Sequence, residues 1–166
     1  MAADGRDRIR AGWQSVLFLL VAPGTVAGVI PWLITGWQGS TPWAWVAVPG
    51  WLLIGAGATV LLHAFGLFVV RGLGTPAPVA PTRSLVVTGT YRWVRNPRDL
   101  AVTAAILGQA LLFGSWQLVA YAAVVVAAFV TFVYWYEEPT LRGRYGAEYD
   151  SYRSTVPGWW PRRPRS

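Results

Sequence analysis

The sequence has no cysteine, no lysine and a single histidine, His63, among its 166 residues. Without cysteine there can be no disulfide bond, thiolate nucleophile or cysteine-ligated metal, and one histidine is too few for an ordinary zinc site. Charged residues make up only 13% of the chain, whereas soluble domains carry about a quarter. We therefore expect no metal centre and no ordinary soluble domain.

Long apolar blocks without Arg, Asp or Glu make up most of the chain. They cover residues 13–37, 43–70, 100–116 and 117–136. About twenty apolar residues span a hydrocarbon core about 30 Å thick, and a helix that is apolar all round must be surrounded by lipid or by other helices. We predict an all-α fold in a single membrane domain, residues 1–166, built as a polytopic bundle of about four transmembrane helices.

The distribution of the fourteen arginines predicts the topology. Three precede the first block, five lie between the second and third, and six follow the fourth. The remaining connections have none, which is the positive-inside pattern for an even number of crossings. We therefore expect cytoplasmic termini, a cytoplasmic loop at residues 71–99 and a cytoplasmic C-terminal segment at residues 137–166. This pattern explains the net charge of +7 without a nucleic-acid partner, and it leaves the oligomeric state open.

Small and aromatic residues predict further packing. Small residues should let helices approach closely in the first two blocks, at Gly24, Gly28, Gly55 and Gly57. The fourth helix should end at Glu137-Glu138-Pro139, where proline suits the first turn of a new helix. Apolar and aromatic residues then recur at helical spacing, which predicts a short amphipathic helix at the membrane surface, at Leu141, Tyr145, Tyr149 and Tyr152.

Ionisable residues flank the last two apolar blocks on the same predicted side. Because the helices of a hairpin are antiparallel, Arg95 and Asp99 should meet Glu137 and Glu138. Ionisable groups at membrane depth are candidates for function. An arginine and carboxylates beside an apolar wall suit a zwitterionic ligand, such as a free amino acid or S-adenosylmethionine. His63 either lines this pocket or is a polar residue satisfied inside the bundle.

A longer pattern contains these residues. The run from Leu85 to Pro97 precedes the hairpin, and Glu137-Glu138-Pro139, Tyr145-Gly146 and Val156-Pro157 follow it. In order and spacing, about residues 72–161 closely resemble the isoprenylcysteine carboxyl methyltransferase and phospholipid methyltransferase family. The resemblance implies an integral membrane enzyme that uses S-adenosyl-L-methionine to methylate a lipophilic small molecule or lipid. We expect a bacterial member in the inner membrane.

The resemblance also implies site residues. The set that would bind the cofactor is Leu85, Val86, Tyr91, Arg95, Asn96, Pro97, Arg98, Asp99, Glu137 and Glu138. Within it, Leu85, Val86 and Tyr91 would enclose the adenosine and Glu137 would bind the ammonium. Gly72 and Gly74 resemble a glycine pair of the phospholipid branch.

The sequence departs from the family pattern at two places. Arg98-Asp99 stands where most relatives carry a Met-Tyr-like pair, so Asp99 is a candidate catalytic residue. It could be a base toward the acceptor, a partner for ribose hydroxyls, or only an acid favoured at a helix start. Residues 128–136 lack the arginine that engages a substrate carboxylate in eukaryotic members. A prenylcysteine carboxylate is therefore not expected, and amines, thiols, hydroxyls and lipid head groups stay open as acceptors.

Two other functions remain compatible with the pattern. One is a catalytically silent membrane protein that keeps the fold as a binding or assembly module. The other is a nicotinamide-dependent reductase of the sterol type, although the chain lacks the length and extra helices of such enzymes.

Overall fold

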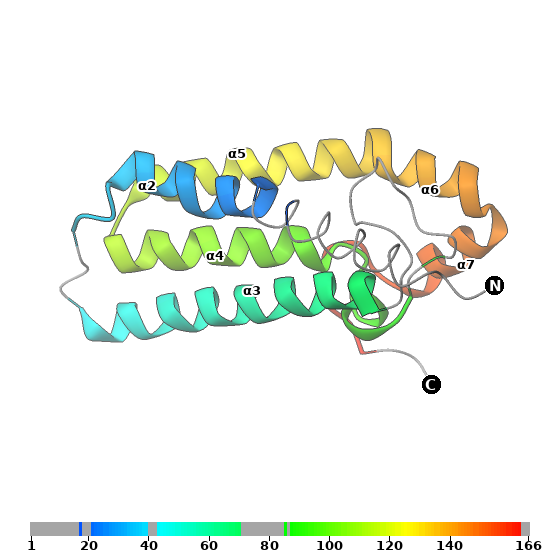
Figure 1. The fold of residues 1–166 in the computed structure, drawn as a ribbon, viewed down its shortest axis with the longest axis horizontal. Helices are drawn as coiled ribbons and strands as arrows, with labels where there is room; N and C mark the ends of the chain where they lie inside the picture. Colours follow the sequence, from blue (N-terminus) through cyan, green and yellow to red (C-terminus); the bar gives the residue numbers. More distant parts are fainter. Residues whose placement is uncertain (1–16, 18–20, 40–42, 71–84, 86, 164–166) are drawn as a thin grey trace.

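The computed structural model describes residues 17, 21–39, 43–70, 85 and 87–163, without the side chains of residues 68–70. Within this part of the chain all regular structure is helical, which confirms the all-α class. The elements, shown in Figure 1, are η1 (Thr25–Val29), α2 (Ile30–Thr35), α3 (Ala44–Val70), η2 (Gly89–Arg92), α4 (Pro97–Phe113), α5 (Trp116–Phe132), η3 (Val133–Glu137), α6 (Glu138–Tyr145) and α7 (Ala147–Thr155).

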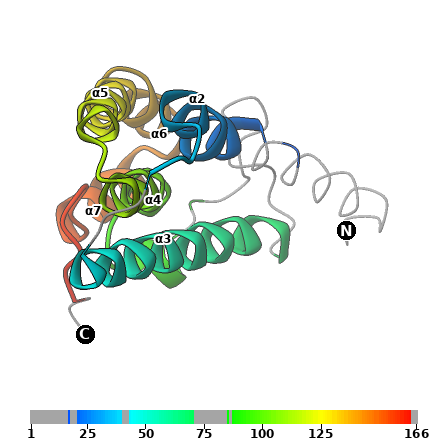
Figure 2. The same ribbon diagram turned by 90° about the vertical axis from the view of Figure 1, so that its left-hand side faces the viewer.

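Three long helices form the body of the protein. α4 lies between α3 and α5, and α2 packs beside α4 and α5 (Figures 1 and 2). The end of α3, the start of α4 and the end of α5 lie at the same end of the bundle, beside η2, α6 and α7 (Figure 1). This arrangement gathers the charged segments at one end.

Close contact between the α3 and α4 backbones depends on glycine. A Cβ atom on Gly57 would lie 2.6 Å from the carbonyl oxygen of Ala101, and one on Gly108 would lie 2.6 Å from that of Gly50. No side chain fits at either point, so the small-residue contact predicted at Gly57 is confirmed. At two other predicted positions, Gly28 and Gly55, no atom of the described residues lies within 4 Å of such a Cβ, so close packing there stays a prediction.

A proline in the first helix determines where polar side chains from α4 and α5 bind. Pro31 follows the π-helical η1, cannot donate a hydrogen bond and displaces the carbonyl four residues earlier. Gln109 Nε2 donates to that carbonyl, Ala27 O, at 2.7 Å, and the Tyr121 hydroxyl donates to Val26 O at 2.9 Å. Both carbonyls are therefore satisfied within the protein, as apolar surroundings require.

The fourth predicted helix does not end at Glu137-Glu138-Pro139. α5, η3 and α6 form one helix, Trp116–Tyr145. The π-helical turn η3 accommodates Pro139, and the Glu138 N–H donates to Val133 O. The predicted new helix with proline in its first turn is present as α6, but no break separates it from α5, because η3 joins the two.

The predicted amphipathic helix is interrupted. Gly146 has a φ of +52°, which ends α6 and separates it from α7. A positive φ favours glycine. The segment after Pro139 is therefore two short helices, and their location at a membrane surface stays a prediction.

In the described part of the chain, two helices are long and apolar enough to cross a membrane, Ala44–Leu67 and Trp116–Tyr145. Only 11% and 22% of their most apolar stretches are buried, so most of these side chains face outward. α4 has 17 residues, which gives a length of about 25 Å against a hydrocarbon core of about 30 Å. Since the described part of the first helix, Val21–Thr35, is shorter still, four crossings stay a prediction.

Candidate functional site

The turn before α4 is held by the C-terminal tail. The Arg95 N–H donates to Pro157 O at 2.9 Å, and the Asn96 N–H donates to Gly158 O at 3.3 Å. The buried Asn96 side chain donates to the same Gly158 oxygen at 3.2 Å. A Cβ on Gly158 would lie 3.1 Å from Arg95 Nη2, so the tail fits closely. Asn96 thus fixes the turn, a role that the resemblance did not imply for it.

Two further bonds tie the C-terminal segment to η2 and to the residue after it. The Arg162 N–H donates to Trp93 O at 3.0 Å. The Tyr152 hydroxyl donates to Tyr91 O at 2.8 Å. η2 and the tail therefore hold each other in place beside the start of α4.

Glu138 is at the centre of a buried network that joins three segments. Arg95 Nη1 lies 2.6 Å from Glu138 Oε1, and Arg153 Nη2 lies 3.3 Å from Glu138 Oε2. Arg95 Nη1 also donates to the Tyr149 hydroxyl at 3.1 Å. Glu138 is only 8% exposed, and both of its oxygens are engaged. It therefore links the turn, α6 and α7, and offers little to a ligand.

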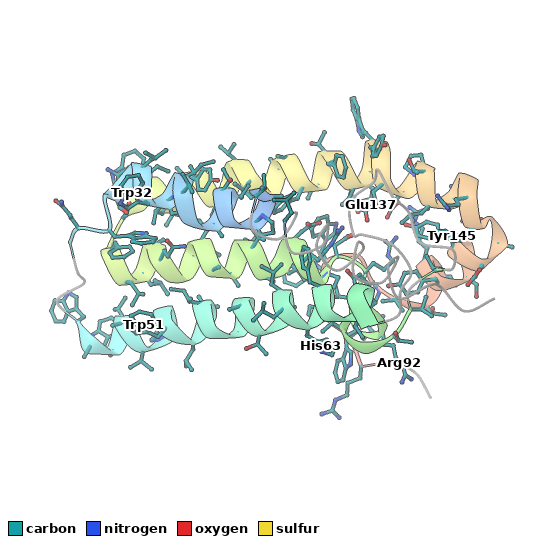
Figure 3. The ribbon with its side chains drawn as sticks, viewed as in Figure 1. Trp32, Trp51, His63, Arg92, Glu137 and Tyr145 are labelled. Atoms are coloured by element: carbon teal, nitrogen blue, oxygen red, sulfur yellow. The ribbon has the colours of Figure 1, made fainter. Side chains whose placement is uncertain are left out.

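Glu137 belongs to a separate and more open cluster. Its Oε1 lies 3.4 Å from Arg98 Nη2, and its side chain is 27% exposed. Its second oxygen has no hydrogen bond to the described residues. Figure 3 shows Glu137 pointing from the helix toward the interior of the bundle end. Glu137 can therefore receive a cation that Glu138 cannot.

Asp99 lies in the first turn of α4, next to Arg98. Its carboxylate forms no hydrogen bond or ion pair with the described residues. Burial raises the pKa of Asp99 to about 6; Arg98 opposes the rise and Glu137 adds to it. Burial also raises the pKa of the nearby Tyr91 hydroxyl to about 12. This cluster sets one arginine against two carboxylates, so it has an excess negative charge when both carboxylates are ionised.

The expected convergence of charges is confirmed, with pairings that the sequence did not reveal. Arg95 pairs with Glu138, whereas Arg98 pairs with Glu137. Pro97 is buried at the start of α4, and Leu85 is partly buried. Three other predicted residues lie outside the described part of the chain: Val86, Gly72 and Gly74.

His63 does not join either cluster. A Cβ on Gly89 would lie 2.8 Å from His63 Nε2, which places His63 against η2 on the α3 side. Figure 3 shows it well away from Glu137. Among the described residues, no group of three His, Cys, Asp or Glu side chains is arranged to hold a metal ion.

Sequence reasoning missed four residues at this end of the bundle. Tyr149 and Arg153 complete the Glu138 network. Thr88 Oγ1 and Thr90 Oγ1 are buried without a hydrogen-bond partner among the described residues. A buried hydroxyl normally has a partner, so these two are candidates for ligand contact. Both belong to the run from Leu85 to Pro97, and that membership was their only sequence signal.

The fold and site define a helical protein with outward-facing apolar helices and a buried charged site at one end. Comparison with protein families matches residues 45–148 to the phospholipid methyltransferase family. The chain belongs to this isoprenylcysteine/phospholipid methyltransferase family. No curated protein and no solved structure matches it. The family and the two long apolar helices fit a membrane protein with methyltransferase activity.

The matched range differs from the expected one. It includes nearly all of α3 together with Glu137 and Glu138, but it ends before Tyr149, Arg153 and the C-terminal tail that binds the turn before α4. The resemblance inferred from the sequence began near residue 72 and reached residue 161. The matched range therefore contains the residues of the Glu137 cluster, whereas the tail contacts lie beyond it.

Proposed function

We propose that this protein transfers a methyl group from S-adenosyl-L-methionine to a lipophilic small molecule or lipid in the membrane. The observation that carries the proposal is the Glu137 cluster, an accessible carboxylate beside Arg98 at the buried end of the bundle. Family membership supplies the reaction class. The exposed apolar faces of α3 and α5 support delivery of an acceptor from the bilayer.

The residues of the site fit this cofactor. The free oxygen of Glu137 would bind the ammonium, and the hydroxyls of Thr88 and Thr90 would be available to the adenosine. S-adenosylmethionine carries one net positive charge, which the negative excess around Arg98 and Asp99 would balance. When bound, this cofactor supplies an activated methyl group on a sulfonium, ready for a single displacement.

The chain itself would contribute alignment and exclusion of water. Buried Tyr91, Val94 and Pro97 form an apolar wall around the turn. The tail and the Glu138 network keep that turn in one conformation. Such positioning supplies a large part of the rate for a displacement that needs little side-chain chemistry.

The proposed setting is a bacterial inner membrane with both termini in the cytoplasm. The arginine distribution supports this orientation, because the loops and ends on one side hold all fourteen arginines. The proposed partners are the lipophilic acceptor and membrane lipid. No nucleic-acid partner is proposed.

Calorimetry on the detergent-purified full chain tests the cofactor assignment. We expect S-adenosylhomocysteine to bind the wild type, and Glu137→Gln to weaken binding about tenfold or more, because a charge-assisted bond contributes about 1.5–3 kcal/mol. The matched control is Glu148→Gln, the same substitution at an exposed glutamate of α7, and it should bind like the wild type. Absence of binding, or equal binding by Glu137→Gln, refutes the assignment.

Methyl transfer itself needs a second measurement. Membranes incubated with methyl-labelled S-adenosylmethionine should yield label in the lipid extract. Cofactor binding without label would identify a catalytically silent protein. Oxidation of a reduced nicotinamide in place of labelling would identify the reductase alternative.

A further inference from the structure

Asp99 is set apart from the other acids at this end of the bundle. Glu138 is held by two arginines and Glu137 by one. The Asp99 carboxylate has neither a hydrogen bond nor an ion pair within the described part of the chain, although its backbone carbonyl accepts a bond from Thr103. A carboxylate without a partner in a partly buried cluster is available to bind a proton.

Among the described residues, few charged and titratable groups lie around Asp99. Arg98 and Glu137 act on it, and η2 contributes Tyr91. The only titratable side chain of α3 is His63, which lies against Gly89. Arg95 is occupied by Glu138, and Arg153 is 39% exposed, so that solvent screens its charge. Within the part of the chain that the structure describes, the charges that act on Asp99 are therefore those of Arg98 and Glu137.

A bound cation would change this balance. While a positive charge is present in the site, both carboxylates are compensated and Asp99 is stable as an anion. Once the methyl group has left, sulfur is neutral and the cluster again has an excess negative charge. At that moment proton binding by Asp99 becomes favourable, because it restores neutrality in surroundings of low dielectric constant.

We propose that Asp99 accepts the proton released by the methyl acceptor, and that the acceptor is therefore a protic group, O–H, N–H or S–H, and not a carboxylate. This inference rests on the proposed function. It deepens that function by naming the chemical class of the acceptor and the residue that selects it.

The step balances in atoms and electrons. A lone pair on the acceptor atom forms the new bond to the methyl carbon. The bond between that carbon and sulfur breaks, and its electron pair stays on sulfur. The acceptor's proton passes to a carboxylate oxygen of Asp99, which can later release it to water. A carboxylate acceptor has no proton to release and would need no such base.

The other two interpretations of Asp99 fit the structure less well. An acid stabilised only by the start of a helix has a lowered pKa, whereas burial raises the pKa of Asp99. A residue that only binds ribose hydroxyls would respond equally to S-adenosylmethionine and S-adenosylhomocysteine, since both contain the same ribose. The two ligands differ in charge at sulfur, and this difference allows a direct test.

Calorimetry at pH 6 in two buffers of different ionisation enthalpy counts the protons released on binding. The wild type should release about 0.5 proton more with S-adenosylmethionine than with S-adenosylhomocysteine, because a carboxyl with a pKa of about 6 is half protonated at that pH. Asp99→Asn should bind both ligands and lose the difference. The control Asp150→Asn, at an exposed aspartate paired with Arg142, should keep it.

The outcomes separate this inference from the proposed function. If neither ligand binds the wild type, the proposed function fails and the inference fails with it. If both bind with equal proton release, or if Asp99→Asn keeps the difference, only the inference is overturned. The wild-type comparison needs no variant, so it decides the matter even if Asp99→Asn does not fold.

Labelled lipid from the transfer assay tests the acceptor class. Alkali converts a methyl ester into volatile methanol, but it leaves methyl groups on ether oxygen, amine nitrogen or thioether sulfur in place. We expect the label to resist alkali and stay with the acceptor. Recovery of the label as methanol would identify a carboxylate acceptor and overturn the inference.

Discussion

Removal of Glu138 should reduce stability far more than removal of its neighbour Glu137. The side chains of Arg95 and Glu138 are 11% and 10% exposed and lie 2.6 Å apart. Loss of one partner leaves the other charge buried, which costs about 3–5 kcal/mol. Arg95 Nε already lacks a partner among the described residues. Since Arg153 is 39% exposed and can be hydrated, we expect Glu138→Ala to lose about 3 kcal/mol.

Glu137 provides the matched comparison. Its contact with Arg98 is longer, 3.4 Å, and its side chain is 27% exposed, so Glu137→Ala should lose about 1 kcal/mol or less. Thermal unfolding in detergent should place Glu138→Ala about 6–12 °C below the wild type and Glu137→Ala within about 4 °C of it. Equal losses, or a greater loss in Glu137→Ala, would refute the division between a structural and a ligand-binding glutamate.

Three further predictions concern stability. Gly57→Ala should cost about 1–3 kcal/mol by pushing α3 off α4, whereas Gly55→Ala, which faces open space, should be neutral or stabilising; thermal unfolding of the pair checks this. Gln109→Leu leaves the carbonyl beside Pro31 without its donor and should cost about 1–2 kcal/mol, measured in the same way. The folded protein binds the Asp99 proton more tightly than the unfolded chain, because burial raises the pKa from 3.8 to about 6. The resulting stabilisation is fully present below pH 3.8 and is lost as the pH rises through about 6. Asp99→Asn should therefore be more stable than the wild type at pH 8, by at most about 3 kcal/mol, with almost no gain at pH 3; a pH-independent difference would contradict the assignment.

The helical class and the bounds of α3 could be predicted from the sequence, because its apolar block lies between the polar, proline-containing residues 38–42 and Arg71. The meeting of α4 and α5 at the charged end could also be predicted, since hairpin geometry alone requires it. The continuation of the helix past Pro139 could not be predicted, because a π-helical turn that accommodates a proline leaves no signal in the composition. The break at Gly146 was missed for a similar reason: a single glycine can lie within a helix or end it.

Which arginine pairs with which glutamate could not be predicted from the sequence either. Arg95 and Arg98 are three residues apart in the sequence, and Glu137 and Glu138 are adjacent, so composition cannot decide which pairs form. The structure separates them because Arg153 and Tyr149 approach Glu138 from α7. α7 follows the two glutamates across the break at Gly146, so its position is visible only in the folded protein. It buries Glu138 and leaves Glu137 accessible.

A crystal structure with bound S-adenosylhomocysteine would show which glutamate holds the cofactor. We expect the ligand's ammonium within hydrogen-bond distance of Glu137, its adenosine near Thr88 and Thr90, and the Arg95–Glu138 pair intact. A ligand held by Glu138 with that pair broken, or one located away from the start of α4, would contradict this expectation.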